Sequence, residues 1–388
     1  MKICYVVDNL DTRAGWGRLA WRIGEGVRSS GHEVSYVCEG SDDTVSQANV
    51  TYTKLTGFGW KNILELFQSL GVLRREVRKA DLVISYDTNP YGILTVLASL
   101  GTDTKVAIYS MGTYSLFDPS GSVGAFLRNQ LMKFAYEKVV CTIIVTDFVK
   151  RKIEQYGYQL PKTMIIPPGV DISGYSPRKE SLENVSKPYI VTVGAIKQRK
   201  GYHLSLEAFG LLQDEFPRLT YVIRGDVDDP GYTRELEERA RELGISDRVV
   251  FLPRIDEESL ARLYSHAELF IMSSTSTANY VEGFGMVYVE AGACGIPVVG
   301  ALDSGAEAAI EDGVTGFLTE PNPNALAEAM RKILSDSDLR AHMGTAGIKH
   351  ATKFDWGKLT EDHIRCYKTL IDEVNDGETN RKLHESVD

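Results

Sequence analysis

Short runs of β-branched and apolar residues alternate with stretches of helical periodicity along the whole chain, and this order limits the possible folds. The strands expected in the first half are Lys2–Asp8, Glu33–Cys38, Leu82–Tyr86, Lys105–Tyr109, Thr142–Val145 and Thr163–Ile166. The helices expected between them are Arg18–Ser30, Asn62–Arg78, Tyr91–Leu100, Val123–Lys138 and Phe148–Tyr156. Because such alternation is typical of parallel sheets joined by crossover helices, we predict an α/β protein.

A break at Pro167-Pro168-Gly169 divides the pattern, and the polar stretch Ser176–Pro188 that follows has the composition of an interdomain linker. Beyond it, strands are expected at Tyr189–Val193, Thr220–Arg224, Arg248–Leu252 and Leu269–Met272, and helices at Tyr202–Asp214, Thr233–Leu243, Glu257–Ser265 and Met286–Cys294. A chain of 388 residues is too long for one ordinary core. We therefore predict two Rossmann-like domains, residues 1–170 and 171–355.

Charge and composition exclude several classes of protein. The net charge of −10 argues against nucleic-acid binding, although residues 1–168 hold 19 Lys and Arg against 16 Asp and Glu. No run approaches the roughly 20 apolar residues that span a bilayer, and the N-terminus lacks the pattern of a signal peptide. Five scattered cysteines, without metal-ligand spacing, favour reduced buried thiols: Cys4, Cys38, Cys141, Cys294 and Cys366. We expect a cytoplasmic protein.

The densest motif of the chain is Glu282-Gly283-Phe284-Gly285-Met286, which runs into a helix that carries Glu290. A helix N-terminus beside glycines offers free backbone N–H groups and the positive end of the helix dipole, which suits a diphosphate. Eight residues of mostly helical chain separate the two glutamates by about 10–12 Å along the axis. That is the span of a sugar diphosphate with its ribose. The alternative is a buried helix with two structural glutamates.

A basic turn follows the strand Tyr189–Val193. Gly194 ends that strand, and Lys197-Gln198-Arg199-Lys200-Gly201 leads into the next helix. A cation aimed at a leaving diphosphate stabilises charge that grows in the transition state. A solvated surface turn is the alternative.

Together with these two motifs, several others occur in the order that is typical of glycosyltransferase family 4. They are Ala293–Val299, Ile166–Asp171, Ile223–Asp226, Asp312–Phe317 and Phe354–Trp356. The resemblance covers most of the chain and implies the GT-B fold: two Rossmann-like domains with parallel sheets facing across a cleft. It also implies that the C-terminal helix, about residues 356–388, returns to the first domain. One such motif is weak, but the whole set in register is specific.

The resemblance implies retaining, metal-independent transfer of a hexose-type sugar from a UDP- or GDP-linked donor to a hydroxyl of a sugar, glycolipid or small-molecule acceptor. Residues 1–170 would bind the acceptor and residues 171–355 the donor. Glu282 would orient the sugar, Lys200 would neutralise the leaving diphosphate, and Glu290 would hold the ribose. The other donor-binding residues implied are Gly15, Gly17, Gly194, Arg199, Arg254, Gly283, Phe284, Gly285 and Met286.

On the acceptor side, the loop before the first helix contains Trp16, which either stacks on a sugar or packs internally. Ser110, Gly112 and Thr113 follow a strand and are expected beside the sugar. The chain departs from the family pattern at Met111, where His is usual, and at Ala195, where Arg is usual. Two rival hypotheses stay open: a binding-only relative that has lost catalysis through these departures, and a sugar-nucleotide epimerase or a phosphorylase, which would share the GT-B fold but not the Glu282/Glu290 arrangement.

Two further strings have competing interpretations. Asp226-Val227-Asp228 spells a metal-binding DxD, but its loop position favours a solvated turn, so we expect no metal. The segments Val123–Phe134 and Phe58–Lys61 mix apolar and basic residues. Such a mixture suits either peripheral contact with an anionic membrane or ordinary packing with cations reaching solvent.

Overall fold

The computed structural model describes residues 1–10, 15–42, 45, 49–54, 63–112, 115–116, 120–183, 185–276 and 280–385. The chain divides into two compact units. Unit 1 comprises Met1–Pro168 together with Trp356–Asp388, and unit 2 comprises Gly169–Asp355.

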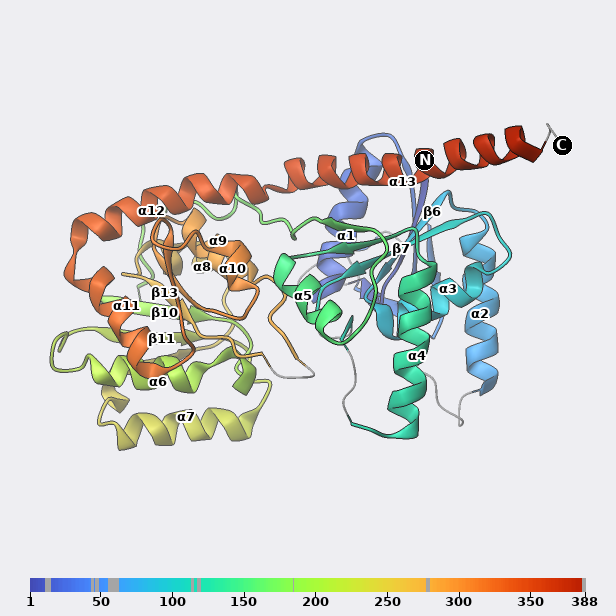
Figure 1. The fold of residues 1–388 in the computed structure, drawn as a ribbon. Helices are drawn as coiled ribbons and strands as arrows, with labels where there is room; N and C mark the ends of the chain where they lie inside the picture. The colour runs from blue at the N-terminus through green and yellow to red at the C-terminus, as the bar shows by residue number, and fades with distance from the viewer. Residues whose placement is uncertain are drawn as a thin grey trace. The chain divides into compact units, whose positions relative to one another are not determined.

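Unit 1 is built on a seven-stranded parallel sheet with the order β5-β3-β1-β6-β7-β8-β9. Two of its neighbouring strands, β6 and β7, are labelled in Figure 1. Its strands are β1 (Lys2–Val6), β3 (Glu33–Cys38), β5 (Val50–Tyr52), β6 (Leu82–Tyr86), β7 (Lys105–Ser110), β8 (Cys141–Ile144) and β9 (Thr163–Ile165). A two-stranded ladder joins β2 (Asn9–Leu10) to β4 (Gly40–Ser41). The chain builds the large sheet outward in both directions from the β1–β6 pair, so the strand order reverses there.

The helices of unit 1 are α1 (Gly15–Ser29), α2 (Ile63–Val77), α3 (Ile93–Ser99), α4 (Val123–Lys138), α5 (Asp147–Gln155) and α13 (Trp356–Glu385). Although α13 is the last helix of the chain, it packs on α1 in this first unit. A Cβ atom on Gly26 would lie 2.5 Å from the side-chain oxygen of Thr360, so only glycine permits this approach. Trp356–Glu385 thus completes unit 1, and the resemblance had implied the same return.

Beneath α13 the core of unit 1 is rich in tyrosine. Tyr5 stacks on Tyr36 and lies against Tyr86, and its hydroxyl is 3.5 Å from that of Tyr367. His363 from α13 contacts the rings of Tyr109 and Tyr367. Burial lowers the pKa of His363 to about 3, so this histidine is a neutral core residue.

Unit 2 is built on a six-stranded parallel sheet with the order β12-β11-β10-β13-β14-β15. Its strands are β10 (Tyr189–Val193), β11 (Thr220–Arg224), β12 (Val249–Leu252), β13 (Phe270–Met272), β14 (Val298–Ala301) and β15 (Gly316–Thr319). The central strand β10 is buried along its whole length, as expected when helices cover both faces of a parallel sheet. Here the strand order reverses between β10 and β13.

The helices of unit 2 are α6 (Tyr202–Leu211), α7 (Pro230–Glu242), α8 (Glu257–Ser265), α9 (Met286–Ala293), α10 (Ala306–Ala309), α11 (Pro323–Ser335) and α12 (Ser337–Ala351). Short 3₁₀ turns lie at η4 (Gln198–Lys200), η5 (Ser246–Arg248) and η6 (Thr352–Phe354). Helix α9 packs closely on α12, because a Cβ atom on Gly347 would lie 3.0 Å from the carbonyl oxygen of Gly292. This contact sets the position of α9.

The structure confirms the predicted α/β class, and it adds elements that the sequence analysis did not predict. Strand β5 and the helices α10, α11 and α12 were not foreseen. The stretch Ser176–Pro188 belongs to unit 2, where the backbone N–H of Arg178 donates to the hydroxyl of Ser265 at 3.0 Å. All five cysteines are buried and unbridged, as predicted. Within the described residues, no helix is both long enough and apolar enough to cross a bilayer.

Candidate functional site

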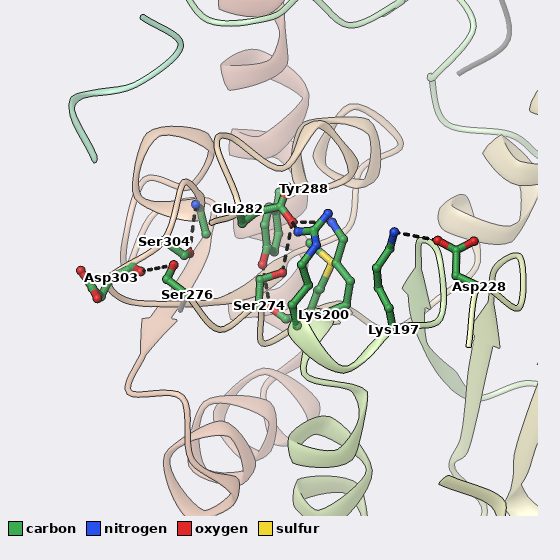
Figure 2. A network of polar contacts seen from close by, with 12 residues as sticks. Lys197, Lys200, Asp228, Ser274, Ser276, Glu282, Tyr288, Asp303 and Ser304 are labelled. Atoms are coloured by element: carbon green, nitrogen blue, oxygen red, sulfur yellow. Dashed lines mark hydrogen bonds and ion pairs between the residues drawn. The ribbon is translucent and has the colours of Figure 1, made fainter. Parts of the chain in front are cut away.

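In unit 2 the loops after β10 and β13 meet where the strand order reverses. Open parallel sheets bind ligands outside the carboxyl ends of their strands at such a reversal. The loop after β10 carries the basic turn that ends at Lys200, and the loop after β13 begins at Ser273 and leads to Glu282. Figure 2 shows the polar network that these loops form.

The basic turn is fixed against the loop after β13. Gly201 ends η4 with a positive φ of 69°, and a Cβ atom there would lie 1.8 Å from the carbonyl oxygen of Ser273. The backbone N–H of Thr275 donates to the carbonyl of Arg199 at 2.8 Å. Glycine is therefore required at position 201, both by its backbone conformation and by the lack of space. The turn has a defined geometry instead of being a free surface loop.

Glu282 lies at the centre of the network. Its Oε2 atom accepts hydrogen bonds from Lys200 Nζ, from Arg199 Nη1 at 3.2 Å and from the hydroxyl of Ser274 at 3.4 Å (Figure 2). The side chains of Glu282 and Lys200 are each only 12% exposed. The structure thus places together three residues that the sequence analysis assigned to one site, and it adds Ser274.

Burial and charge act in opposite directions on this cluster. Burial lowers the pKa of the Lys200 ammonium below its ordinary value, and the neighbouring Glu282 offsets part of that effect. Burial alone would raise the pKa of Glu282, but Lys200 and Arg199 together outweigh burial and hold that pKa below its ordinary value. The site therefore holds one ionised carboxylate beside two cations. An anionic ligand can compete with Glu282 for Lys200 and Arg199.

The first turn of α9 presents backbone to the same region. Gly285 precedes the helix in the left-handed conformation, with φ 84° and ψ 63°. A Cβ atom there would lie 2.7 Å from the ring of Tyr288, whose hydroxyl donates to the carbonyl of Met272 at 2.6 Å. The ring of Phe284 is buried against Phe354, with 5.2 Å between centroids. Phe284 can therefore offer a ligand only its backbone.

The remaining donor-side residues differ in their surroundings. Glu290 is half-buried on α9, and Tyr264 donates to it at 3.5 Å. Gly194 lies beside the turn, since a Cβ atom on it would be 4.0 Å from Lys200 Cε. Arg254 is instead exposed and pairs with Asp226 at 3.6 Å, so the structure does not bring it into the cluster around Glu282.

The DxD string is engaged in ion pairs. Asp228 accepts from Lys197 at 2.6 Å (Figure 2), and Asp226 pairs with Arg254. The loop is tied to the strand edge by the backbone N–H of Ile196, which donates to the carbonyl of Asp226 at 2.8 Å. Both carboxylates thus have cationic side chains as partners.

In unit 1, Gly15, Trp16 and Gly17 form the first turn of α1 and not the loop that was predicted before the helix, and Trp16 is half-buried. Ser110 ends β7, fully buried, and Gly112 follows with a positive φ of 125°. Thr113 and the segment Phe58–Lys61 lie outside the described residues. Helix α4 exposes Val123, Phe126 and Leu127, by 77%, 61% and 56%.

One polar residue that the sequence analysis missed stands out in unit 1. Asp87 directly follows β6, is fully buried, and accepts hydrogen bonds from the hydroxyl of Ser115 and the backbone N–H of Met111. A charged residue immediately after a fully buried strand was the signal available in the sequence.

Comparisons with known proteins agree with this geometry. One family model, described as Glycosyltransferase Family 4, matches residues 14–173, and another, Glycosyl transferases group 1, matches residues 176–350. A D-inositol 3-phosphate glycosyltransferase of Corynebacterium urealyticum is 32% identical over 255 residues, which cover 62% of this chain and 59% of that protein. Its counterpart from Nocardia farcinica is 32% identical over 233 residues, covering 57% and 51%. The match thus spans little more than half the length of these relatives.

Among solved structures, a glycosyltransferase from Rickettsia africae superposes with a TM-score of 0.79 at 19% identity, covering 96% of this chain and 98% of that one. The Anabaena protein HepE in complex with UDP superposes with a TM-score of 0.78 at 19% identity, covering 95% and 100%. These structural similarities show that the chain has the GT-B fold. With both of its halves matched by family models, the chain belongs to the family 4 type of glycosyltransferases.

Proposed function

We propose that the chain transfers a hexose-type sugar from a nucleotide diphosphate sugar to an acceptor hydroxyl, with retention at the anomeric carbon and without a metal ion. The observation that carries this proposal is the cluster of Glu282 with Lys200 and Arg199 at the strand-order reversal of unit 2. Unit 2 is the donor-binding domain in this proposal, and unit 1 binds the acceptor.

The donor would lie along the first turn of α9. The backbone N–H groups at Phe284, Gly285 and Met286 would receive the diphosphate, as helix N-termini do for anions generally. Glu290, one helical stretch further on, would accept hydrogen bonds from the ribose hydroxyls. Glu282 would accept hydrogen bonds from the sugar once Lys200 and Arg199 turn to the phosphates.

In the reaction, the bond between the anomeric carbon and the diphosphate oxygen breaks, and the acceptor oxygen bonds to that carbon on the same face. The acceptor's proton passes to an oxygen of the leaving diphosphate, so no side-chain base is required. Negative charge on the diphosphate grows as its bond breaks. Lys200 and Arg199 stabilise that charge in a region where solvent is largely excluded, which strengthens their effect.

The comparisons suggest where to look for substrates. Uridine diphosphate is the favoured nucleotide, because HepE was determined with UDP, UDP with glucose, and UDP-glucose. A GDP-linked donor stays the alternative. The curated relatives are named D-inositol 3-phosphate glycosyltransferases, so inositol 3-phosphate is the first acceptor to test.

The proposal is tested by titrating the purified chain with UDP, GDP and ADP in a calorimeter, and then assaying transfer from the matching glucose-linked donor. We expect the preferred nucleotide to bind and NMR of the product to show the donor's anomeric configuration. Binding without turnover would identify a binding-only relative, and an isomerised sugar nucleotide would identify an epimerase. Inversion at the anomeric carbon would refute the retaining mechanism.

A further inference from the structure

The second strand-order reversal, between β1 and β6 in unit 1, carries a polar residue that the proposed reaction has not used. Asp87 follows the last residue of β6, at the carboxyl end of that strand. By the rule that ligands bind at such reversals, its position alone makes it a candidate contact for a ligand. Three further observations point the same way.

The backbone of Asp87 is held in a conformation that non-glycine residues rarely adopt, with φ 62° and ψ 166°. Its N–H donates to the carbonyl of Tyr109 at 2.9 Å, and its own carbonyl accepts from Gly92 at 3.1 Å. Conformations of this kind cost roughly 1–3 kcal/mol and persist where the surroundings impose them, commonly at ligand-binding sites. The fold therefore keeps a strained aspartate where a glycine would be easier.

Only one of the two carboxylate oxygens of Asp87 makes hydrogen bonds. Oδ1 accepts hydrogen bonds from the Ser115 hydroxyl and, at 3.3 Å, from the backbone N–H of Met111, which fixes the chain after β7. Oδ2 is buried with no hydrogen-bond partner. Burial raises the pKa of Asp87 to about 7, so near neutral pH this carboxyl can either accept or donate a hydrogen bond.

Ser110 repeats the pattern on the neighbouring strand. Its hydroxyl is fully buried and also has no partner. Asp87 directly follows the Tyr86–Tyr109 pair of the β6–β7 register, and its carboxylate accepts from the backbone N–H of Met111, the residue after Ser110, so the two residues lie at the same end of neighbouring strands. An unpartnered buried polar group costs about 1–3 kcal/mol, so two at one sheet edge call for an explanation.

We propose that Asp87 and Ser110 together form a binding subsite for the uncharged hydroxyl groups of a polyol, the acceptor in the reaction proposed above. This inference rests on that proposed function. A carboxyl oxygen beside a hydroxyl can both accept from and donate to vicinal hydroxyls. Asp8, which follows β1, is the charged group whose field reaches Asp87, and it too is an acid. The subsite therefore has no attraction for phosphate, unlike the cluster in unit 2.

The test uses the full chain and two uncharged probes, myo-inositol and methyl α-glucoside, measured by saturation-transfer NMR with saturating UDP. Ser110→Ala removes a hydroxyl that makes no hydrogen bond in the structure, so it should fold normally and weaken polyol binding several-fold. Asp87→Asn should weaken it at least ten-fold. Thr142→Val removes another unpartnered buried hydroxyl, on β8, and should change nothing.

UDP affinity should be the same in all four proteins. The proposed subsite would be refuted if the wild type binds neither probe, or if Ser110→Ala binds the probes as tightly as the wild type does. Either result would decide the question even if Asp87→Asn fails to fold. Loss of UDP binding by the wild type would instead refute the proposed function. The two failures are therefore distinguishable.

Discussion

The two units have the same kind of sheet but opposite chemistry at the point where the strand order reverses. In unit 2, a carboxylate is surrounded by cations: Glu282 pairs with Lys200 and Arg199. In unit 1, Asp87 has no cationic side chain as a partner among the described residues, and one of its carboxylate oxygens makes no hydrogen bond. Cations that can turn from a carboxylate to a ligand suit an anion. A buried carboxyl without a cationic partner suits neutral hydroxyl groups. In this account the shared topology places one proposed site in each unit, and the side chains decide which class of ligand each site binds.

The largest expected effect concerns the cations of unit 2. Lys200→Ala should lower kcat by two to three orders of magnitude, or about 2.7–4 kcal/mol, because its contribution grows as the diphosphate gains charge. Binding of the intact sugar nucleotide should weaken much less. Steady-state kinetics and calorimetry measure both quantities.

Lys197→Ala is the matched control for Lys200, because Lys197 belongs to the same turn but pairs with Asp228. It should leave kcat within about two-fold, in keeping with the small value of exposed ion pairs. Arg199→Ala should also lower kcat, but by less than Lys200→Ala, if Arg199 replaces the Arg that is missing at Ala195. An unchanged kcat with weakened donor binding in Lys200→Ala would show that Lys200 is a uniform-binding contact.

The next effect concerns the uncompensated carboxyl of unit 1. The pKa of Asp87 is raised from 3.8 to about 7, chiefly by burial, with Asp8 adding to burial and Ser115 and Met111 opposing it. Between these values the folded chain keeps a proton that the unfolded chain releases, so the free energy of unfolding falls as pH rises from about 4 to 7. Asp87→Asn removes the titrating carboxyl, so this fall in the free energy of unfolding with rising pH should disappear.

Urea unfolding of wild type and Asp87→Asn at pH 5 and pH 8 measures that difference. The variant should gain about 3 kcal/mol relative to the wild type on going from pH 5 to pH 8, from the linkage between proton binding and folding. A difference between the two proteins that does not change with pH would contradict the assignment of a raised pKa to Asp87.

A smaller effect is expected at the ribose contact. Glu290→Gln keeps the size of the side chain but removes the charge-assisted hydrogen bonds to the ribose, so affinity for the bare nucleotide diphosphate should fall by about ten-fold or more. Calorimetric titration measures this. Unchanged affinity would assign Glu290 a structural role with Tyr264, its partner at 3.5 Å.

The smallest expected effect is no change at all. Transfer should survive excess EDTA, because cations and helix N–H groups neutralise the diphosphate in this account. Asp228→Asn should also leave the rate unchanged, since Asp228 pairs with Lys197 instead of facing the donor. Loss of activity in EDTA that Mg²⁺ or Mn²⁺ restores would revive Asp226 and Asp228 as metal ligands.

Much of the fold was predictable because its signals are local. Strands such as β10 are buried on both faces, which produces continuous apolar runs between helical stretches. The helices α11 and α12 were missed although Asn322 and Asp336 cap them through side-chain hydrogen bonds. Those capping residues were the local signal, and the sequence analysis did not use it.

The site was predictable only in part, because its geometry depends on contacts between distant residues. Sequence motifs assigned Lys200 and Glu282 to one site, but their direct pairing follows from the adjacency of β10 and β13. No local pattern indicated that Arg254 pairs with Asp226. The strained backbone and free oxygen of Asp87 are likewise products of packing, and no spacing rule predicts them.

The central claim is that the cation-bearing reversal in unit 2 receives the nucleotide, and hydrogen exchange with saturating UDP tests it most directly. Exchange of backbone amides should slow in residues 283–286 and 198–201, and it should stay unchanged in residues 87–92 and 110–112. Slowed exchange around Asp87 and Ser110, with none at Gly283–Met286, would contradict the account.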